Sequence, residues 1–184
     1  AITEGLSAKI VTYGLSADND FYASDISYNE KGCASFLAHE GDTTIGQITL
    51  SIPGEHNVQN ALAAIALCTQ MKIPVTSIIS GLSAFHGTKR RFEKKGTVGG
   101  ITIIDDYAHH PTEIKATLHA AQHYPHREIW CVFQPHTYTR TKAFFNDFAE
   151  ALTLADHVVL ADIYAARETD TLGISSKQLA DRIR

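Results

Sequence analysis

The chain has 184 residues, of which 44% are hydrophobic and 20% are charged, as in an ordinary globular protein. Its net charge is −4 and its longest basic run is Lys89–Arg91, which argues against a nucleic-acid-binding surface. The three cysteines are widely spaced and odd in number, so we expect no disulfide framework and a cytoplasmic location. No run of 18 apolar residues suggests a membrane helix, and there is no signal-peptide pattern. Because the chain lacks an initiator Met and begins and ends abruptly, we expect a fragment of a longer protein.

The segment from residue 9 to residue 54 is predicted to form β-strands. Its β-branched and aromatic residues fall into four runs, and Gly, Asp and Asn separate them. Short connections of this kind favour antiparallel pairing. The four predicted strands are Lys9–Tyr13, Phe21–Tyr28, Cys33–Ala38 and Thr43–Ile52.

Two helices are predicted next, an alanine-rich one at His56–Leu67 and a shorter one at Val75–Phe85. Asn57 and Asn60 are three residues apart and therefore share one face of the first turn. A helix cap would account for one of these asparagines, because Asn is a common capping residue. It accounts poorly for the second, so the pair is a candidate binding feature.

We predict a domain boundary near residues 86–90, which divides the chain into residues 1–88 and 89–184. The basic run Lys89–Arg91 lies at this boundary. Such a run favours a solvated hinge. The alternative is a clamp for phosphate or carboxylate, for which Arg offers a rigid fork of donors.

The second part alternates between strands and helices. A hairpin is predicted first, with strands at residues 91–93 and 98–105 and its turn at Lys95–Gly96. Alternation with apolar strands predicts an α/β fold with a mostly parallel sheet flanked by helices, and Ile101–Ile104 is predicted to be a buried strand. The further predicted elements are helix Pro111–His123, strand Glu128–Phe133, helix Thr139–Leu154, strand His157–Ile163 and helix Ser175–Ile183, with Ser175 as its cap.

Polar residues follow three of these strands, at Asp105–His110, Gln134–Arg140 and Ile163–Glu168. If the strands are parallel, their carboxyl ends share one edge of the sheet, where ligands of α/β proteins bind. Arg140 suits an anionic group of a ligand. No zinc spacing, Walker loop, dinucleotide fingerprint or nucleophile elbow is present. Composition and spacing therefore predict a two-part site for an anionic ligand and go no further.

Four motifs, taken together and in this order, resemble the Mur ligase family, the ATP-dependent amide ligases of peptidoglycan precursor synthesis. The last motif is most similar to the branch that joins L-alanine to UDP-N-acetylmuramate. The motifs are Gly54-x-His56-Asn57-x-x-Asn60-Ala61-x-Ala63-Ala64, Arg90–Glu93, Asp105–Glu113 and Phe133–Thr141.

The resemblance implies a specific domain organisation. Residues 1–88 would be the C-terminal part of a central ATPase domain, with antiparallel strands and helices. Residues 89–184 would form a Rossmann-like C-terminal ligase domain that lacks its last strands and helices. The resemblance further implies that a UDP-binding domain, the P-loop and the Mg²⁺ ligands precede residue 1.

The resemblance also implies a reaction and its participants. ATP, with Mg²⁺, would phosphorylate the carboxylate of UDP-N-acetylmuramate, and the amine of L-alanine would displace phosphate from the acyl phosphate. No metal ligand is expected in this chain. The resemblance implies that ATP is contacted by Asn57 and Asn60 at the adenine and by Arg91 and Asp106 elsewhere. The amino acid and the muramyl carboxylate would be contacted by Tyr107, His109, His136 and Arg140. The expected catalytic residues are Asp106, His109, His136 and Arg140. Thr137 departs from the pattern, since some relatives are expected to carry a basic residue there.

Two alternatives stay open. A sister ligase would attach another amino acid or a recycled peptide to the same sugar, although the Gln134–His136 segment favours L-alanine. A non-catalytic nucleotide-binding module would leave the Asp105–His110 loop unexplained. Because the chain has no P-loop, we expect these 184 residues alone to show no ligase or ATPase activity.

Overall fold

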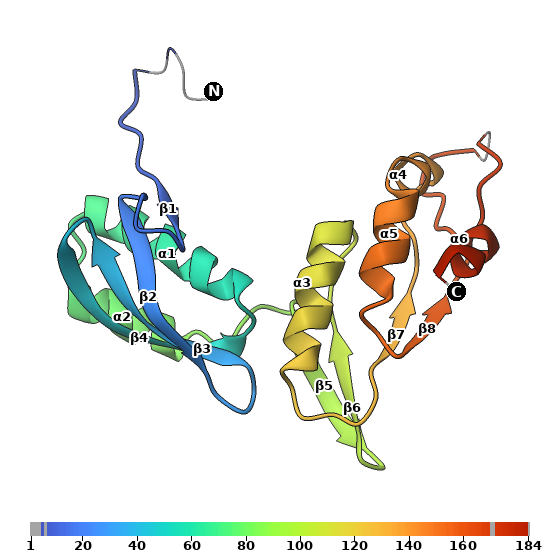
Figure 1. Cartoon of the computed structure of the whole chain (residues 1–184), viewed down its shortest axis with the longest axis horizontal. Coiled ribbons are helices and arrows are strands. Elements are labelled where there is room, and N and C mark those ends of the chain that lie inside the picture. The colour runs from blue at the N-terminus through green and yellow to red at the C-terminus, as the bar shows by residue number, and fades with distance from the viewer. Residues whose placement is uncertain (1–4, 6, 170–171, 184) are drawn as a thin grey trace. The chain divides into compact units, whose positions relative to one another are not determined.

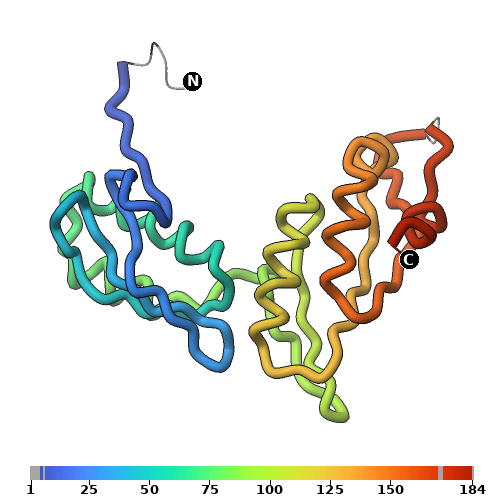
Figure 2. Tube along the Cα trace, viewed as in Figure 1, coloured from blue at the N-terminus to red at the C-terminus, as the bar shows by residue number. Residues whose placement is uncertain are grey.

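The computed structural model describes residue 5 and residues 7–169 and 172–183. The chain divides into two compact units, Ala1–Gly87 and Thr88–Arg184, and each unit has its own hydrophobic core. Figure 1 labels the elements of both units, and Figure 2 follows the same path along the Cα atoms. Among the described residues, no helix combines the length and the apolar character needed to cross a membrane.

The first unit is built on a four-stranded sheet with the order β1-β2-β3-β4 (Figure 1). β2, β3 and β4 pair antiparallel, as their short connections predict, whereas β1 pairs parallel with β2. The strands are β1 (Tyr13–Gly14), β2 (Phe21–Tyr28), β3 (Cys33–Glu40) and β4 (Thr43–Pro53).

The prediction of a strand at Lys9–Tyr13 is wrong except at its last residue, where β1 begins. The preceding residue, Thr12, donates its backbone N–H and its hydroxyl to the Asp20 carboxylate, at 2.7 and 2.9 Å. The Asp20 side chain therefore accepts hydrogen bonds that would otherwise go to the backbone of a neighbouring strand.

The helices α1 (His56–Gln70) and α2 (Val75–Ala84) complete the first unit and match the predicted ones closely. Both contribute side chains to the core of the sheet, since the fully buried Leu62 and Ile65 of α1 and the buried Ile78 of α2 lie in one cluster with strand residues. The small Ala61 belongs to the same cluster, so the alanine-rich pattern serves close packing.

The second unit begins with an antiparallel hairpin of β5 (Glu93–Val98) and β6 (Ile101–Asp105). Its turn lies at Gly99–Gly100, so the predicted turn at Lys95–Gly96 is wrong. Both turn glycines have positive φ, 57° and 82°, as two-residue hairpin turns require. Gly96 instead lies inside β5, where the register of its pairing with β6 shifts between Lys94 and Gly96.

The strands β7 and β8 form a parallel pair, and together with the helices they confirm the predicted α/β class. Within the described residues, however, β6 pairs with β5 in one two-stranded sheet and β7 pairs with β8 in another. The expected sharing of one sheet by all three strands is therefore not seen among the described residues. The remaining elements are α3 (Pro111–Gln122), β7 (Trp130–Phe133), α4 (Tyr138–Ala143), α5 (Phe145–Leu152), β8 (His157–Leu160) and α6 (Ser176–Ile183).

One predicted helix of this unit differs from the observed structure, and another keeps its predicted cap. The predicted helix Thr139–Leu154 is interrupted at Phe144, whose ring packs against His110 with centroids 4.6 Å apart. The predicted cap of the last helix is present, because the Ser175 hydroxyl accepts from the Gln178 N–H at 3.3 Å.

The helices cover one face of the second unit's strands and leave the other face exposed. Phe133 of β7 is buried in the core with side chains of α3, α5 and α6, whereas the adjacent residue Val132 points to the other side and is 77% exposed. The prediction of a buried strand at Ile101–Ile104 is therefore wrong for two of its residues, since Ile101 is 70% exposed and Ile103 is 49% exposed. Residues that alternate along a strand face opposite sides, and only one side has a covering layer.

Candidate functional site

Asp106 joins the two ends of the β5–β6 hairpin. Its two carboxylate oxygens accept from the backbone N–H groups of Phe92 and Ala108, each at 2.7 Å. Phe92 has a positive φ of 45°, a conformation that non-glycine residues rarely adopt. Asp106 therefore fixes the backbone that follows the Arg90–Arg91 pair, and each of its oxygens keeps lone-pair capacity for a ligand.

Tyr107 lies beneath the basic pair. The guanidinium of Arg90 is 4.5 Å from the centre of its ring, and that of Arg91 is 5.9 Å away. Arg90 is also 3.9 Å from the Asp105 carboxylate, and its carbonyl accepts the Tyr107 N–H at 2.8 Å. The half-exposed phenol and the two cations thus form one surface in which positive charge is held beside an aromatic face.

The first turn of α3 binds the histidine segment through Glu113. The backbone N–H groups of His109 and His110 donate to its carboxylate at 3.0 and 3.2 Å, and Arg91 lies 3.9 Å away. His110 caps the helix by accepting from the Thr112 N–H at 3.3 Å, which completes a capping box. Burial raises the pKa of Glu113, but these hydrogen bonds and the charges of His109 and Arg91 outweigh it and hold the pKa below its ordinary value.

His109 is held on two sides and remains partly exposed. Its Nδ1 lies 3.0 Å from the Tyr107 carbonyl and 3.3 Å from the Glu113 carboxylate. The Tyr107 ring meets it edge-on, with centroids 5.4 Å apart. A proton on Nδ1 satisfies these acceptors, which leaves Nε2 as the imidazole atom that can accept a proton or a hydrogen bond from a ligand.

The loops that follow β7 and β8 are joined beyond the ends of the strands. The Tyr164 N–H donates to the Pro135 carbonyl and the Thr137 N–H donates to the Tyr164 carbonyl, both at 2.9 Å. His136 forms an isolated parallel bridge with Tyr164, and their rings lie 5.5 Å apart. The Nδ1 atom of His136 is buried and has no hydrogen-bond partner within the part of the chain that the structure describes. An unsatisfied buried polar atom is uncommon, so this nitrogen is a candidate to meet a ligand or a water molecule.

Arg140 projects from the first turn of α4. Thr137 caps this turn by accepting from the Arg140 N–H at 3.4 Å. The Arg140 guanidinium forms no ion pair with any described carboxylate, although it is partly buried. A half-buried guanidinium without a counter-charge is suited to the carboxylate or phosphate of a ligand.

Glu168, in the loop after β8, is the feature of this region that the sequence did not reveal. Its carboxylate accepts from the Thr139 N–H at 3.0 Å and also from the Thr139 hydroxyl. Thr139 precedes Arg140 directly, so Glu168 contacts the first turn of α4, which carries Arg140 and begins two residues after His136. The only signal in the sequence was an acidic residue in the third polar loop, and nothing there indicated its partner.

Asn57 and Asn60 lie on the first turn of α1 in the first unit, as their spacing predicts. The Asn57 amide donates to the Pro53 carbonyl at 2.7 Å and accepts from the Asn60 amide at 3.1 Å. Neither side chain caps the helix, whose first turn is preceded by Glu55 without a capping side chain. The exposed Asn60 oxygen has no described partner, so one amide face remains available to a ligand.

The predicted site residues of the second unit therefore fall into two groups. Arg91, Asp106, Tyr107 and His109 surround the start of α3, whereas His136 and Arg140 lie on the joined loops after β7 and β8. The contact between the rings of His110 and Phe144 connects the two groups, since it links the α3 cap to the junction of α4 and α5.

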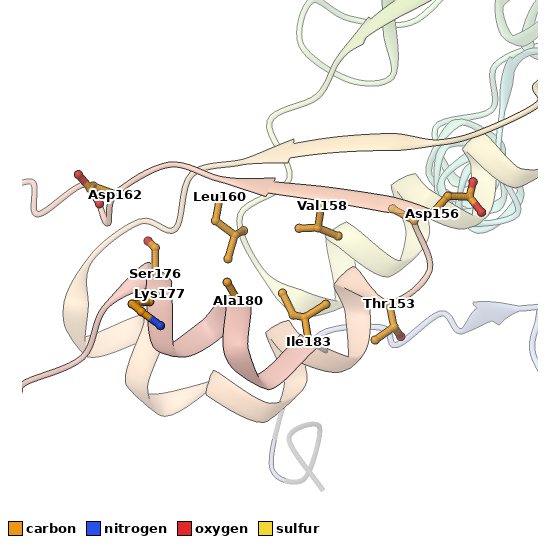
Figure 3. A pocket seen from close by; sticks show the side chains of 10 residues that line it. Thr153, Asp156, Val158, Leu160, Asp162, Ser176, Lys177, Ala180 and Ile183 are labelled. Atoms are coloured by element: carbon orange, nitrogen blue, oxygen red, sulfur yellow. The ribbon is translucent and has the colours of Figure 1, made fainter.

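A hollow of about 570 Å³ lies elsewhere in this unit, between β8 and α6 (Figure 3). Figure 3 shows Val158 and Leu160 of β8 facing Ala180 and Ile183 of α6 across it. None of the predicted site residues lines it. Among the described residues, no three His, Cys, Asp or Glu side chains are grouped so as to hold a metal ion.

Comparisons with known proteins identify both units. The family pattern of the Mur ligase middle domain matches residues 1–68, and that of the Mur ligase glutamate ligase domain matches residues 90–184. The UDP-N-acetylmuramate–L-alanine ligase of Agathobacter rectalis is 59% identical over 98% of this chain, and that of Lachnospira eligens is 57% identical over 96%. This chain spans only 39% of the length of each of these relatives.

Solved structures show the same similarity. The UDP-N-acetylmuramate–alanine ligase MurC of Thermotoga maritima has a TM-score of 0.76 and 31% identity, covering 94% of this chain and 36% of its own. The murein peptide ligase mpl of Psychrobacter arcticus has a TM-score of 0.62 and 31% identity, covering 94% of this chain and 35% of its own.

Proposed function

Because the chain belongs to the Mur ligase family, we propose that it forms part of an ATP-dependent ligase that joins L-alanine to UDP-N-acetylmuramate. Residues 1–88 would be the C-terminal part of the central ATPase domain, and residues 89–184 would form the C-terminal ligase domain. The observation that carries the proposal is the 59% identity, over 98% of this chain, with a relative named for this reaction.

The loops after β7 and β8 support a role in binding the acyl and amino-acid substrates. Arg140 offers to a carboxylate a guanidinium that pairs with no described acidic side chain, and His136, four residues earlier, has a buried nitrogen without a described partner. Holding an amine against an activated carboxyl group accelerates amide formation chiefly by positioning. We assign the muramyl and L-alanine carboxylates to this region, with Tyr107 and His109 on the neighbouring surface.

His109 is the residue best suited to handle a proton in this reaction. The attacking amine must lose a proton as the amide forms, and a general base must lie within hydrogen-bond reach of it. Tyr107 and Glu113 hold the His109 ring through Nδ1, so that Nε2 is the atom available to accept a proton. We propose this role for Nε2 of His109.

The described residues also fit a nucleotide. The amide face of Asn60, supported by Asn57, can donate to and accept from a purine edge. Arg91 and Asp106 bring a cation and a carboxylate of the kind that bind phosphate and ribose hydroxyls. ATP, when bound, supplies the phosphoryl group that activates the substrate carboxylate, and we propose that these four residues contact it.

A second candidate is the attachment of a recycled peptide to the same sugar. The similarity to the murein peptide ligase of Psychrobacter arcticus, 31% identical and covering 94% of this chain, favours it specifically. Its chemistry would be the same, and only the amine substrate would differ. The two candidates therefore require a test by substrate preference.

The test is phosphate release from the longer natural protein that contains these residues. UDP-N-acetylmuramate, ATP and Mg²⁺ would be supplied with L-alanine, glycine, L-serine or a tripeptide that begins with L-alanine. We expect L-alanine to give the highest kcat/KM and Arg140→Ala to lower it severely. Preference for the tripeptide would assign the peptide ligase reaction instead, and no release with any amine would refute both candidates.

A further inference from the structure

Thr137 adopts a backbone conformation that is costly for its residue type. Its φ is 66° and its ψ is 144°, a region that only glycine enters readily. Thr is β-branched, which makes a positive φ still less favourable. A strained residue of this kind persists only when its surroundings fix it. The surroundings of Thr137 should therefore include groups whose task is to hold this turn.

Backbone contacts from the neighbouring loop supply part of this support. The Thr137 N–H donates to the Tyr164 carbonyl at 2.9 Å. The Thr137 carbonyl accepts from the Thr141 N–H at 3.1 Å and from the Thr141 hydroxyl at 2.7 Å, and Thr141 is fully buried. These bonds fix both peptide groups of Thr137 and close the first turn of α4, but they leave the Thr139 N–H of that turn without an acceptor.

Glu168 supplies the support for that turn. Its carboxylate accepts both donors of Thr139, the backbone N–H at 3.0 Å and the hydroxyl. Its own N–H donates to the Ala165 carbonyl at 2.9 Å, and the intervening Ala166 has a positive φ of 54°. The loop after β8 is therefore bent so that its acidic side chain meets α4.

The charge on Glu168 fits this task. Hydrogen bonds from the side chain and then the backbone of Thr139 lower the pKa of Glu168, with smaller contributions from the Tyr138 backbone and the charge of His136. The side chain is therefore ionised at neutral pH, and it forms no ion pair with Lys or Arg among the described residues. Thr139 lies between His136 and Arg140 in sequence, so the carboxylate fixes the turn that places both.

We propose that Glu168 is a positioning residue, which holds the strained Thr137–Thr139 turn and thereby places His136 and Arg140 for the amino-acid and acyl substrates. The role in positioning for catalysis rests on the proposed ligase function. The role in holding the turn rests on this chain alone. Glu168 does not itself contact substrate in this proposal.

The first experiment measures amide hydrogen exchange in the 184-residue chain for Glu168→Ala, Glu168→Gln and the control Glu150→Ala. Glu150 is a matched carboxylate, since Lys115 bonds it at 2.7 Å on the surface of α5. We expect Glu168→Ala to speed exchange at Thr139 and Thr141 by about tenfold, because a hydrogen bond to a charged group is lost. Gln keeps one acceptor oxygen and should restore most of the protection, and Glu150→Ala should change neither amide. Unchanged exchange in Glu168→Ala would overturn the proposal.

The second experiment measures kcat and KM in the longer protein with the same variants. We expect Glu168→Ala to lower kcat/KM for L-alanine about 10- to 100-fold, as a misplaced site residue does, while KM for ATP stays within about twofold. Glu168→Gln should recover most of this loss. Equal loss in Gln and Ala, or equal activity in Glu168→Ala and Glu150→Ala, would overturn the positioning role. An inactive wild-type protein would refute the proposed function, and the exchange experiment would still decide whether Glu168 holds the turn.

Discussion

At the scale of single residues, several carboxylates of this chain bind the backbone of loops. Asp106 accepts two backbone N–H groups, and Glu113 accepts two more at the start of α3. Asp20 and Glu168 each accept the N–H and the hydroxyl of one threonine. Hydrogen bonds to a charged acceptor are stronger than neutral ones, so each carboxylate fixes a loop that apolar packing does not.

The first prediction concerns Asp106. Replacement by Ala leaves the Phe92 and Ala108 N–H groups without their acceptor, and we expect this to destabilise the second unit by about 1–3 kcal/mol. Activity of the longer protein should fall severely. Urea denaturation of this chain and the kinetics of the longer protein would measure the two effects.

Asp105→Ala is the matched control, because the Asp105 carboxylate makes only a 3.9 Å contact with Arg90 and is partly exposed. Its loss should change stability by less than about 1 kcal/mol. An equal cost for the two variants would show that the backbone bonds of Asp106 do not matter. Unchanged kinetics in Asp106→Ala would remove it from the site.

The second prediction concerns the pH dependence of stability through Glu113, whose pKa the fold lowers below 4.5. A carboxyl group with a depressed pKa stabilises the folded state when ionised. Its contribution is therefore complete above pH 4.5 and is lost as the pH falls through the folded pKa. We expect Glu113→Gln to flatten the fall in melting temperature between neutral and acidic pH. Thermal unfolding from pH 7 to pH 3 would measure it, and parallel curves for variant and wild type would contradict it.

At the scale of elements, hydrophobic periodicity predicted most helices and strands because it reports the face that each one buries. The predictions were wrong where the local sequence allows more than one structure, or where residues distant in sequence meet in the fold. The sequence predicted a turn at Lys95–Gly96, but Gly96 pairs with Ile103 inside β5 and the chain turns at Gly99–Gly100. The break at Phe144 coincides with a ring contact to His110, and no local pattern in the sequence records that contact.

The third prediction compares glycines in two elements. Gly81 lies inside α2 with an ordinary φ, and a Cβ there meets no atom within 4 Å. Gly81→Ala should therefore stabilise the first unit by about 0.5–1 kcal/mol, since Ala is the better helix former. Gly100 also has open space around it, but its φ is +82°. Gly100→Ala should destabilise the second unit by about 1–2 kcal/mol. Chemical denaturation of both variants would measure the changes, and the same sign for both would contradict the argument.

The candidate site was predicted in part for the same reasons. Short motifs such as Asp105–Glu113 predict polar groups at a strand end, and in the structure these groups lie around the start of α3. The partner of Glu168 is Thr139, and the partner of Asp106 is the backbone of Phe92. Neither pairing follows from spacing, because each depends on how separate loops meet after folding.

At the scale of the whole molecule, the chain consists of two units with separate cores, and it spans 39% of the length of its Agathobacter rectalis relative. The fourth prediction follows from its sequence, which has no G-x-x-x-x-G-K-[ST] loop to hold the terminal phosphates of ATP. The purified 184 residues should release no phosphate from ATP above background, with or without the sugar and the amino acid. Release that Asp106→Ala abolishes would contradict this expectation.

The uncovered face of the second unit also holds the only tryptophan of the chain. Trp130 is 62% exposed there, and its indole stacks on the His157 ring with centroids 4.2 Å apart. A solvated indole emits at longer wavelength than a buried one. All indole fluorescence of this protein therefore comes from Trp130. Any molecule that covered this face would shift the emission to shorter wavelength.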